Sequence, residues 1–452
     1  MIPDAARGTR RRHGGWSLDG DGQPGPRPGP PVEPSASAVR QPHLDPARGP
    51  RADTLRRTST MQDKRSDRRQ LLRAAAVTAG AAVAAPALGG ISPAQAAALA
   101  STGAIPWVGP AGSGATYEVD PTVGAQAAIN TALGSSSQKA VYVAPGTYTV
   151  KAPVVLDDKH ALIGAGPLVT ILRAGAGFSG AGLVVNPQSG TYVGSSRQCV
   201  TDIGLDAAHL VANGINFQMN ATPSSYTPDP APWLTRVFVT RTTGDGIYLG
   251  GTYTGGQREF KLTDCRVENA DGWAYNLQSS DGFVSGCSAQ GCAGGGYLLG
   301  GGNIKIWGSK AYGIGAAGAP APAFRLDSSR ATVVGCEAQD TAGNGFEILG
   351  RNCTVSGCTA DSTGVGSSGT DQNSAGFYVG ASVVSLEGSA FQRTNGGGKW
   401  IVAGAGMRTA LYLAGGVDYL SVRLVSGPDR EAPFQRLVTG TVGTHSSVSV
   451  IG

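Results

Sequence analysis

From residue 199 onward, short runs of alternating apolar and polar residues recur along the chain. Each run ends in a Gly or Asp and then a small residue, and a Gly followed by an aromatic–x–aliphatic triplet comes next. The small residue is Cys265, Cys287, Ser309, Cys336 or Cys358, at spacings of 22, 22, 27 and 22 residues. Alternation with a period of two predicts β-strands. A unit of this length has room for two or three short strands with turns but not for a helix.

A single unit of this kind cannot bury its apolar face, so the units are expected to stack, with Cys on Cys and aromatic on aromatic. The Asn–Gly and Asp–Gly pairs that precede the aromatic residues, such as Asn213-Gly214 and Asp245-Gly246, suit left-handed turn positions at the corners. The longer spacings predict insertions at 313–322 and 363–374. Insertions in a solenoid tend to fall on one face, often the binding face.

Residues before the repeats follow a different pattern. Apolar positions in 123–133 have nearly helical spacing, and Asp120 and Pro121 provide a start signal. Short strands are predicted within 140–148, 154–156, 161–163 and 170–172, because Gly and Pro separate brief apolar runs there. A helix therefore precedes a succession of strands.

These features together resemble the right-handed parallel β-helix proteins of the pectate-lyase superfamily. The resemblance rests on the helix 123–133, Val141-Tyr142-Val143-Ala144-Pro145-Gly146-Thr147-Tyr148, Leu162-Ile163-Gly164-Ala165-Gly166 and the ladder of Asn/Asp–Gly–aromatic units. It covers roughly residues 104–425 and implies an all-β fold, a single-stranded right-handed parallel β-helix with a short N-terminal capping α-helix. It leaves activity open, because the superfamily includes lyases, hydrolases, epimerases and phage adhesins.

Charge divides the chain into two parts. Residues 1–100 contain 15 Lys/Arg and 8 Asp/Glu, a net charge of +7, whereas residues 101–452 contain 21 and 23, a net charge of −2. The slightly acidic main part lacks the basic surface that a nucleic-acid partner requires. No uncharged apolar run reaches the roughly 18 residues of a membrane-spanning helix, so no stable membrane insertion is expected.

The basic N-terminal part is predicted to be a leader that includes a signal peptide. Residues 1–60 are rich in Pro and Arg and are expected to be disordered or a non-native extension. Residues 61–96 combine paired arginines, an Ala/Val run and Ala94-Gln95-Ala96, which is typical of a signal peptide of the twin-arginine type. We therefore expect a secreted protein, exported after folding, whose β-helix domain spans 97–452 and is a monomer.

The seven cysteines are predicted to be buried thiols, because their odd number and shared repeat position argue against a disulfide framework.

The histidines form no nucleophile motif. The superfamily's galacturonan hydrolases carry a Gly-His-Gly element, which this chain lacks. A mannuronan-epimerase Asp-Pro-His-Asp motif is also absent.

Alternate residues on solenoid strands face outward and stack from coil to coil. The repeat alignment predicts one outward column of mixed chemistry: Tyr248, Leu298, Arg325, Glu347 and Tyr378. We expect Tyr248 and Tyr378 to stack on sugar rings and Arg325 to pair with a uronate carboxylate. The alternative is that Arg325 and Glu347 form a cross-strand ion pair of little energetic value.

A second predicted column follows the Cys position and comprises Arg266, Ser288, Lys310, Glu337 and Thr359. Lys310 is a candidate substrate-binding residue there. Asp245 and Asp271 are predicted to occupy equivalent turns near it, where stacked carboxylates would suit Ca²⁺. The alternative is that these aspartates satisfy backbone groups of the turns.

The resemblance implies a carbohydrate-active protein that cleaves an acidic polysaccharide by β-elimination, with Ca²⁺ or a cationic side chain acidifying the proton next to the uronate carboxylate. Two other functions stay open, a non-catalytic glycan-binding or surface-structural β-helix and an inverting glycoside hydrolase. The hydrolase would pair Glu347 with Glu337 or Asp327. The candidates for the base of the elimination are Lys261, Arg266, Lys305 and Arg325.

Overall fold

The computed structural model describes residues 93–452 except 136–138, 188–196, 220–231, 252–257, 317, 366–370, 394–405 and 429–435. The expected extension 1–60 and nearly all of the expected signal peptide lie outside the described residues. No described helix is long and apolar enough to cross a membrane.

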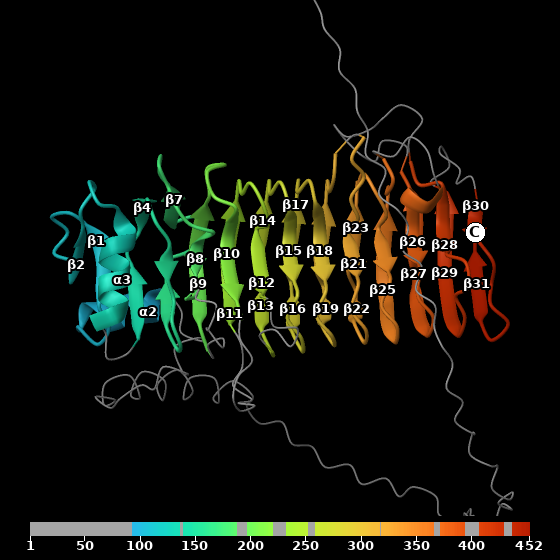
Figure 1. Cartoon of the computed structure of the whole chain (residues 1–452), viewed down its shortest axis with the longest axis horizontal. Helices are drawn as coiled ribbons and strands as arrows, with labels where there is room; N and C mark the ends of the chain where they lie inside the picture. The colour runs from blue at the N-terminus through green and yellow to red at the C-terminus, as the bar shows by residue number, and fades with distance from the viewer. Residues whose placement is uncertain are drawn as a thin grey trace, which may run out of the picture. The chain divides into compact units, whose positions relative to one another are not determined.

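The strands of the described residues form two sheets, and every ladder between named strands is parallel (Figure 1). Sheet B has 11 strands: β5 (Val154–Val155), β8 (Gly182–Val185), β10 (Asn213–Gln218), β12 (Ile247–Gly250), β15 (Trp273–Leu277), β18 (Gly295–Leu299), β21 (Phe324–Leu326), β24 (Phe346–Ile348), β26 (Ala375–Val379), β28 (Thr409–Leu413) and β30 (Arg436–Thr439).

Sheet A has 20 strands and provides the other sides of the coils. Its strands are β1 (Trp107–Pro110), β2 (Tyr117–Val119), β3 (Ala140–Val143), β4 (Gly146–Val150), β6 (Ala161–Ile163), β7 (Thr170–Ala174), β9 (Cys199–Asp206), β11 (Trp233–Thr240), β13 (Lys261–Thr263), β14 (Arg266–Glu268), β16 (Phe283–Ser285), β17 (Ser288–Gln290), β19 (Lys305–Trp307), β20 (Lys310–Tyr312), β22 (Thr332–Val334), β23 (Glu337–Gln339), β25 (Cys353–Asp361), β27 (Val384–Gln392), β29 (Leu420–Pro428) and β31 (Ser447–Ile451).

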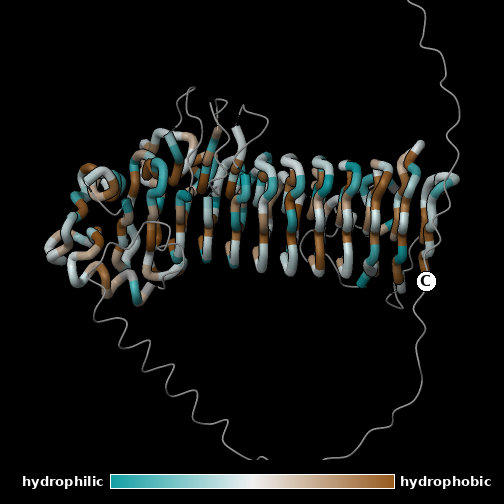
Figure 2. The backbone as a smooth tube through the Cα atoms, turned by 90° about the horizontal axis from the view of Figure 1, so that it is seen from below, coloured by the Kyte–Doolittle hydropathy of each residue, from teal (hydrophilic) through white to brown (hydrophobic). Residues whose placement is uncertain are grey.

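One repeat is one turn of a solenoid. In the coil that begins at residue 261, β13 and β14 belong to sheet A and β15 to sheet B, and they pair with β16, β17 and β18 of the next coil. Apolar segments recur at the same places in successive coils (Figure 2). The fold is therefore the parallel β-helix that the sequence predicts, with three strands in each of the regular coils.

The interior is held by rings and thiols that repeat from coil to coil. Tyr275, Tyr297, Phe324, Phe346 and Phe377 are fully buried, and neighbouring rings stack with centroids 4.6 to 5.0 Å apart. All seven cysteines are buried and unpaired, as predicted. Aromatic side chains stack on aromatic side chains in successive coils because neighbouring strands pair in parallel register.

The N-terminal end is covered by helices. Helix α3 (Ala125–Ser135) buries Ile129 and Leu133 and packs against β1 to β5, which confirms the predicted capping helix and closes the core at this end. Helix α2 (Pro93–Ser101) contributes Leu99 and Ala100 to a small apolar cluster on sheet A with Tyr142. The expected boundary after residue 96 falls within α2.

The glycines of the Asn/Asp–Gly pairs are not in the left-handed region, which corrects the sequence interpretation. Neither Gly214 nor Gly246 has a positive φ. A Cβ atom on Gly246 would lie 2.2 Å from Cγ1 of Val267, so this glycine is required by close packing. The left-handed corners lie elsewhere, for example between the two strand segments of sheet A, where Asp264 and Gly308 have φ values of 54° and 58°.

Candidate functional site

The predicted outward column lies on sheet B. Its register aligns Tyr248, Asn276, Leu298, Arg325, Glu347, Tyr378 and Tyr412 on successive strands from β12 to β28. The five residues predicted from the sequence are all present. Asn276 and Tyr412 were missed, although Tyr275-Asn276-Leu277 and Leu411-Tyr412-Leu413 carry the same alternation of inward and outward residues.

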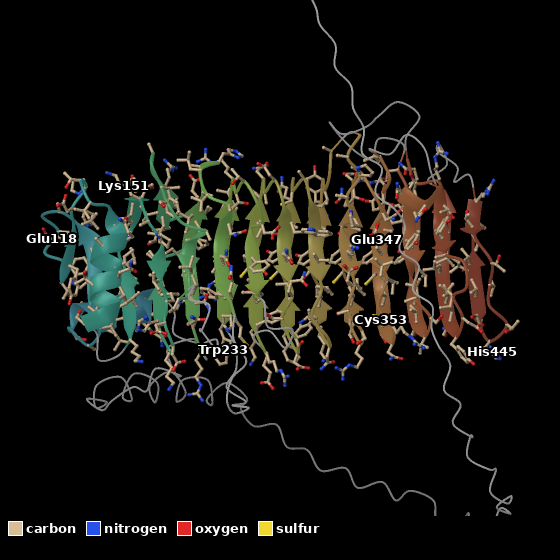
Figure 3. The ribbon with its side chains drawn as sticks, in the orientation of Figure 1. Glu118, Lys151, Trp233, Glu347, Cys353 and His445 are labelled. Atoms are coloured by element: carbon tan, nitrogen blue, oxygen red, sulfur yellow. The ribbon has the colours of Figure 1, made fainter. Side chains whose placement is uncertain are left out.

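Three charged side chains meet where β21 and β24 lie side by side. Nε of Arg325 donates to Oδ1 of Asp327 at 2.8 Å and lies 4.0 Å from Oε2 of Glu347. Oδ1 of Asp327 and Oε2 of Glu347 are therefore at most 6.8 Å apart. Side-chain exposure is 40% for Arg325, 36% for Asp327 and 18% for Glu347, so the glutamate is the most enclosed of the three. Figure 3 places Glu347 in the C-terminal half of the stack of coils.

Asn344 links Glu347 to the insertion that precedes β26. Asn344 is buried, and its Nδ2 donates both to Oε1 of Glu347 at 2.8 Å and to the carbonyl of Gln372 at 2.9 Å. Its Oδ1 accepts the backbone N–H of Ala375 at 2.8 Å. Gln372 belongs to a short 3₁₀ helix, Asp371–Asn373, within the predicted insertion 363–374. The sequence placed Asn344 in the Asn/Asp–Gly ladder but did not predict this contact.

The two carboxyl groups have different environments. Burial raises the pKa of Glu347, and the nearby Asp327 raises it further, while the hydrogen bond from Asn344 and the charge of Arg325 act in the opposite direction. The pKa of Arg325 is raised, chiefly by its hydrogen bond to Asp327. Arg325 is therefore a permanent cation, and Glu347 holds its proton to a higher pH than an ordinary glutamate.

Aromatic side chains continue the column beyond Glu347. The rings of Tyr378 and Tyr412 stack with centroids 5.2 Å apart and an interplanar angle of 7°. Stacked tyrosines on an outer face offer a flat apolar surface with hydroxyl groups at its rim, which suits a sugar ring.

Two amide side chains, Asn276 on β15 and Gln278 directly after it, lie toward the N-terminal end of the column. Nε2 of Gln278 donates to Oδ1 of Asn276 at 2.8 Å, and Nδ2 of Asn276 donates to Oδ2 of Asp245 at 2.8 Å. The other oxygen of Asp245 accepts the backbone N–H of Trp273 at 2.8 Å. Burial raises the pKa of Asp245, although the bonds from Asn276 and Trp273 oppose this effect.

The expected equivalence of Asp245 and Asp271 is wrong. The register of β12 and β15 places Trp273 opposite Asp245, because the inward positions of β15 are taken by Tyr275 and Leu277. The alignment of Asp271-Gly272-Trp273 was therefore shifted by two residues. No group of three His, Cys, Asp or Glu side chains among the described residues is arranged to hold a metal ion. Asp245 and Asp271 are therefore not stacked in register as the predicted calcium site required, and Ca²⁺ binding by this protein stays a prediction.

The remaining predicted residues lie on sheet A. The second column exists as predicted, with Arg266, Ser288, Lys310, Glu337 and Thr359 in register. Lys310 pairs with Glu337 at 3.1 Å, and Arg266 pairs with Glu268. Lys261 and Lys305 also lie on sheet A, with Nζ 4.7 Å from the ring centroid of Trp233 and 5.4 Å from that of Phe283, respectively. The structure therefore separates these candidates from Arg325 and Glu347.

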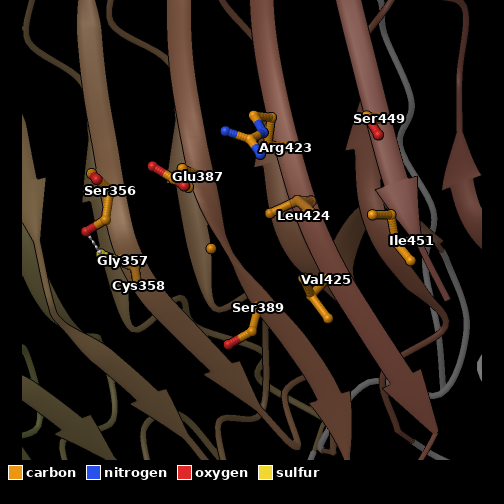
Figure 4. Close-up of a pocket in the computed structure, with 11 residues that line it drawn as sticks. Ser356, Gly357, Cys358, Glu387, Ser389, Arg423, Leu424, Val425, Ser449 and Ile451 are labelled. Atoms are coloured by element: carbon orange, nitrogen blue, oxygen red, sulfur yellow. Dashed lines mark hydrogen bonds between the residues drawn. The ribbon is translucent and has the colours of Figure 1, made fainter.

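A shallow groove with a volume of about 500 Å³ lies on sheet A near its C-terminal end (Figure 4). Glu387 and Arg423 face each other across β27 and β29 there, and Val425 forms part of the apolar lining. Its lining includes none of the candidate catalytic, substrate-binding or metal residues predicted from the sequence.

The stacked coils, the covered N-terminal end and the outward column define a parallel β-helix protein with a mixed aromatic, amide and carboxylate face. The chain belongs to the family described as rhamnogalacturonase A/epimerase, pectate lyase-like, whose model matches residues 118–368, more than half of the chain. No curated protein matches the chain.

Several solved structures are similar to it in fold. The A-module of mannuronan C-5 epimerase AlgE6 from Azotobacter vinelandii is 15% identical, with a TM-score of 0.46, and the match covers 72% of this chain and 94% of that one. The gp42 tailspike of Acinetobacter phage vb_AbaP_AS12 is 14% identical, with a TM-score of 0.49 and coverage of 76% and 62%. The catalytic domain of a GH87 alpha-1,3-glucanase in complex with nigerose is 13% identical, with a TM-score of 0.43 and coverage of 73% and 67%.

Proposed function

We propose that the protein binds an extended polysaccharide along the outer face of sheet B and hydrolyses a glycosidic bond at Glu347. The observation that carries this proposal is the pair of unlike carboxyl groups, Asp327 and Glu347, that lie next to Nε of Arg325. Glu347 is enclosed and has a raised pKa, which suits a general acid that protonates the leaving oxygen. Asp327 accepts a hydrogen bond from the guanidinium of Arg325, which holds it in place as the partner carboxylate of a two-carboxylate mechanism.

The spacing of the two groups supports this mechanism. Glycosidases use carboxyl groups about 5–5.5 Å apart when they retain the anomeric configuration and about 6.5–9.5 Å apart when they invert it. The distances of 2.8 and 4.0 Å from Nε of Arg325 place Asp327 Oδ1 and Glu347 Oε2 at most 6.8 Å apart, which admits the retaining spacing and leaves out most of the inverting range. The stacked pair Tyr378 and Tyr412 would hold a sugar ring next to Glu347.

The β-elimination expected from the sequence has less support. It requires a base that is free to remove a proton next to a uronate carboxylate. Lys261, Arg266 and Lys305 lie on sheet A, away from the column, and Arg325 is hydrogen-bonded to Asp327, which raises its pKa. Among the described residues, none of these four cations combines a place on sheet B with the basicity that elimination needs.

The test is digestion of a panel of neutral and acidic polysaccharides, with reducing ends and the absorbance of unsaturated products followed in parallel. We expect reducing ends without absorbance. Glu347→Gln should lower the rate by about 10²–10⁴-fold. Glu337→Gln is the matched control, because Glu337 is paired with Lys310 on sheet A, and it should keep nearly full activity.

An increase in absorbance would favour the lyase instead. Binding without either product, unchanged by Glu347→Gln, would indicate a non-catalytic glycan-binding protein.

We also propose that the protein is secreted through the twin-arginine route and is a monomer. These proposals rest on the sequence features of residues 61–96 and of the solenoid, respectively.

A further inference from the structure

Charge is scarce on the outer face of sheet B. The strands from β10 to β28 contain only two charged residues, Arg325 and Glu347. Asp327 directly follows β21, Asp245 precedes β12, and Arg408 directly precedes β28, two strands beyond Glu347. Described carboxyl groups along this face thus outnumber its cations.

The one cation within the column is already engaged. Nε of Arg325 donates to Oδ1 of Asp327 at 2.8 Å, and Oε2 of Glu347 lies 4.0 Å from the same nitrogen. Recognition of a uronate carboxylate by a guanidinium is strongest when no carboxylate of the protein already balances the charge of the guanidinium, and Asp327 balances that of Arg325. A uronate at this place would meet an arginine whose charge Asp327 already balances, so it would bring a negative charge for which the sheet B strands from β10 to β28 hold no second cation.

The rest of the column is polar without charge. Asn276 and Gln278 provide amide groups at one end, and Tyr378 and Tyr412 provide stacked phenol rings at the other. Amides donate and accept hydrogen bonds at the same time, as sugar hydroxyl groups do. Aromatic rings contribute apolar contact that does not depend on the charge of the sugar.

We infer that the polysaccharide bound on sheet B is uncharged, so that the protein acts on a neutral glycan and not on a uronate polymer. This inference rests on the proposed function, because it names the substrate class of the same site. It reverses the acidic substrate that the sequence predicts, and the physical reason is that Asp327 already balances the charge of Arg325.

The test measures binding separately from cleavage. Purified full-length protein is run on ice in affinity gels that contain polygalacturonate, alginate, the carboxyl-reduced form of each, or linear neutral glucans, mannans and galactans. Each acidic polymer and its carboxyl-reduced form share a backbone and differ in charge. Tyr378→Ala probes sheet B, and Trp307→Ala is the control, because Trp307 is an exposed aromatic residue on sheet A, with 43% of its surface accessible.

We expect at least one neutral polymer to bind about tenfold or more tightly than any uronate polymer, with an affinity that added salt leaves unchanged. Tyr378→Ala should weaken this binding, and Trp307→Ala should not. Tighter binding of a uronate polymer than of its carboxyl-reduced form, weakened by Tyr378→Ala, would overturn the neutral class and leave glycan binding on sheet B intact. Binding of no polymer would overturn the proposed function together with this inference. Binding that only Trp307→Ala weakens would overturn sheet B as the site.

Discussion

Replacing Asn344 by Asp tests the contact that holds Glu347 in place. The new side chain keeps an oxygen for the backbone N–H of Ala375 but loses the Nδ2 donor that serves Glu347 at 2.8 Å and the Gln372 carbonyl at 2.9 Å. A hydrogen bond to a charged group contributes about 1.5–3 kcal/mol, and a neutral one about 0.5–1.5 kcal/mol. The free energy of unfolding at neutral pH should therefore fall by about 2–4 kcal/mol.

The loss should depend on pH in a defined direction. The pKa of Glu347 is raised above its ordinary value of 4.5, mainly by burial, so its contribution to stability is fully present below that pH and is lost as the pH rises through the folded-state pKa. Asn344→Asp raises this pKa further, because it removes a donor and adds a like charge. The deficit should therefore be largest at neutral pH and should shrink below pH 4.5, where both carboxyl groups bind protons.

Urea titrations of four proteins over a series of pH values measure this effect: the wild type, Asn344→Asp, Glu347→Gln and the double variant. Glu347→Gln alone should be at least as stable as the wild type at neutral pH, and in the double variant it should restore part of the stability lost through Asn344→Asp. A deficit of equal size at acid and neutral pH, or a double variant with no recovery, would refute the role of Asn344 in setting the charge state of Glu347.

Three further predictions concern the fold. Phe324→Ala should lower the free energy of unfolding by about 3–5 kcal/mol, whereas Tyr378→Ala on the outer face should cost about 0.5–1.5 kcal/mol, as measured by urea titration. Gly246→Ala should cost about 1–3 kcal/mol in the same assay, because its Cβ would overlap Val267, and an unchanged midpoint would contradict the close packing at this corner. The seven buried cysteine thiols should resist a maleimide reagent in the native protein and all react in denaturant, and mass spectrometry would reveal any early labelling.

The regular part of the solenoid could be predicted from the sequence because a parallel β-helix is governed by short-range periodicity. The alternation around Phe324 and Phe346 gives the inward and outward faces, and the spacing of the Cys position gives the coil length. The prediction failed at Asp271, where an Asp–Gly–aromatic sequence occurs two residues before the true register. It failed again at Gly246, because the sequence reveals that a glycine is needed but not whether φ or packing requires it.

The sequence by itself determined the class of fold, the capping helix and the order of outward residues that includes Tyr248, Arg325, Glu347 and Tyr378, since each depends on patterns along the chain. Only the tertiary structure decided on which sheet each predicted column lies. It placed Lys310 and Glu337 on sheet A and brought Asp327 to Arg325, because the side of the coil on which a residue lies depends on where the chain bends. It also brought the insertion residue Gln372 to Asn344, which bonds Glu347 directly, and it enclosed the glutamate. Burial of that kind changes the chemistry of a carboxyl group in a way that its position in the sequence does not encode.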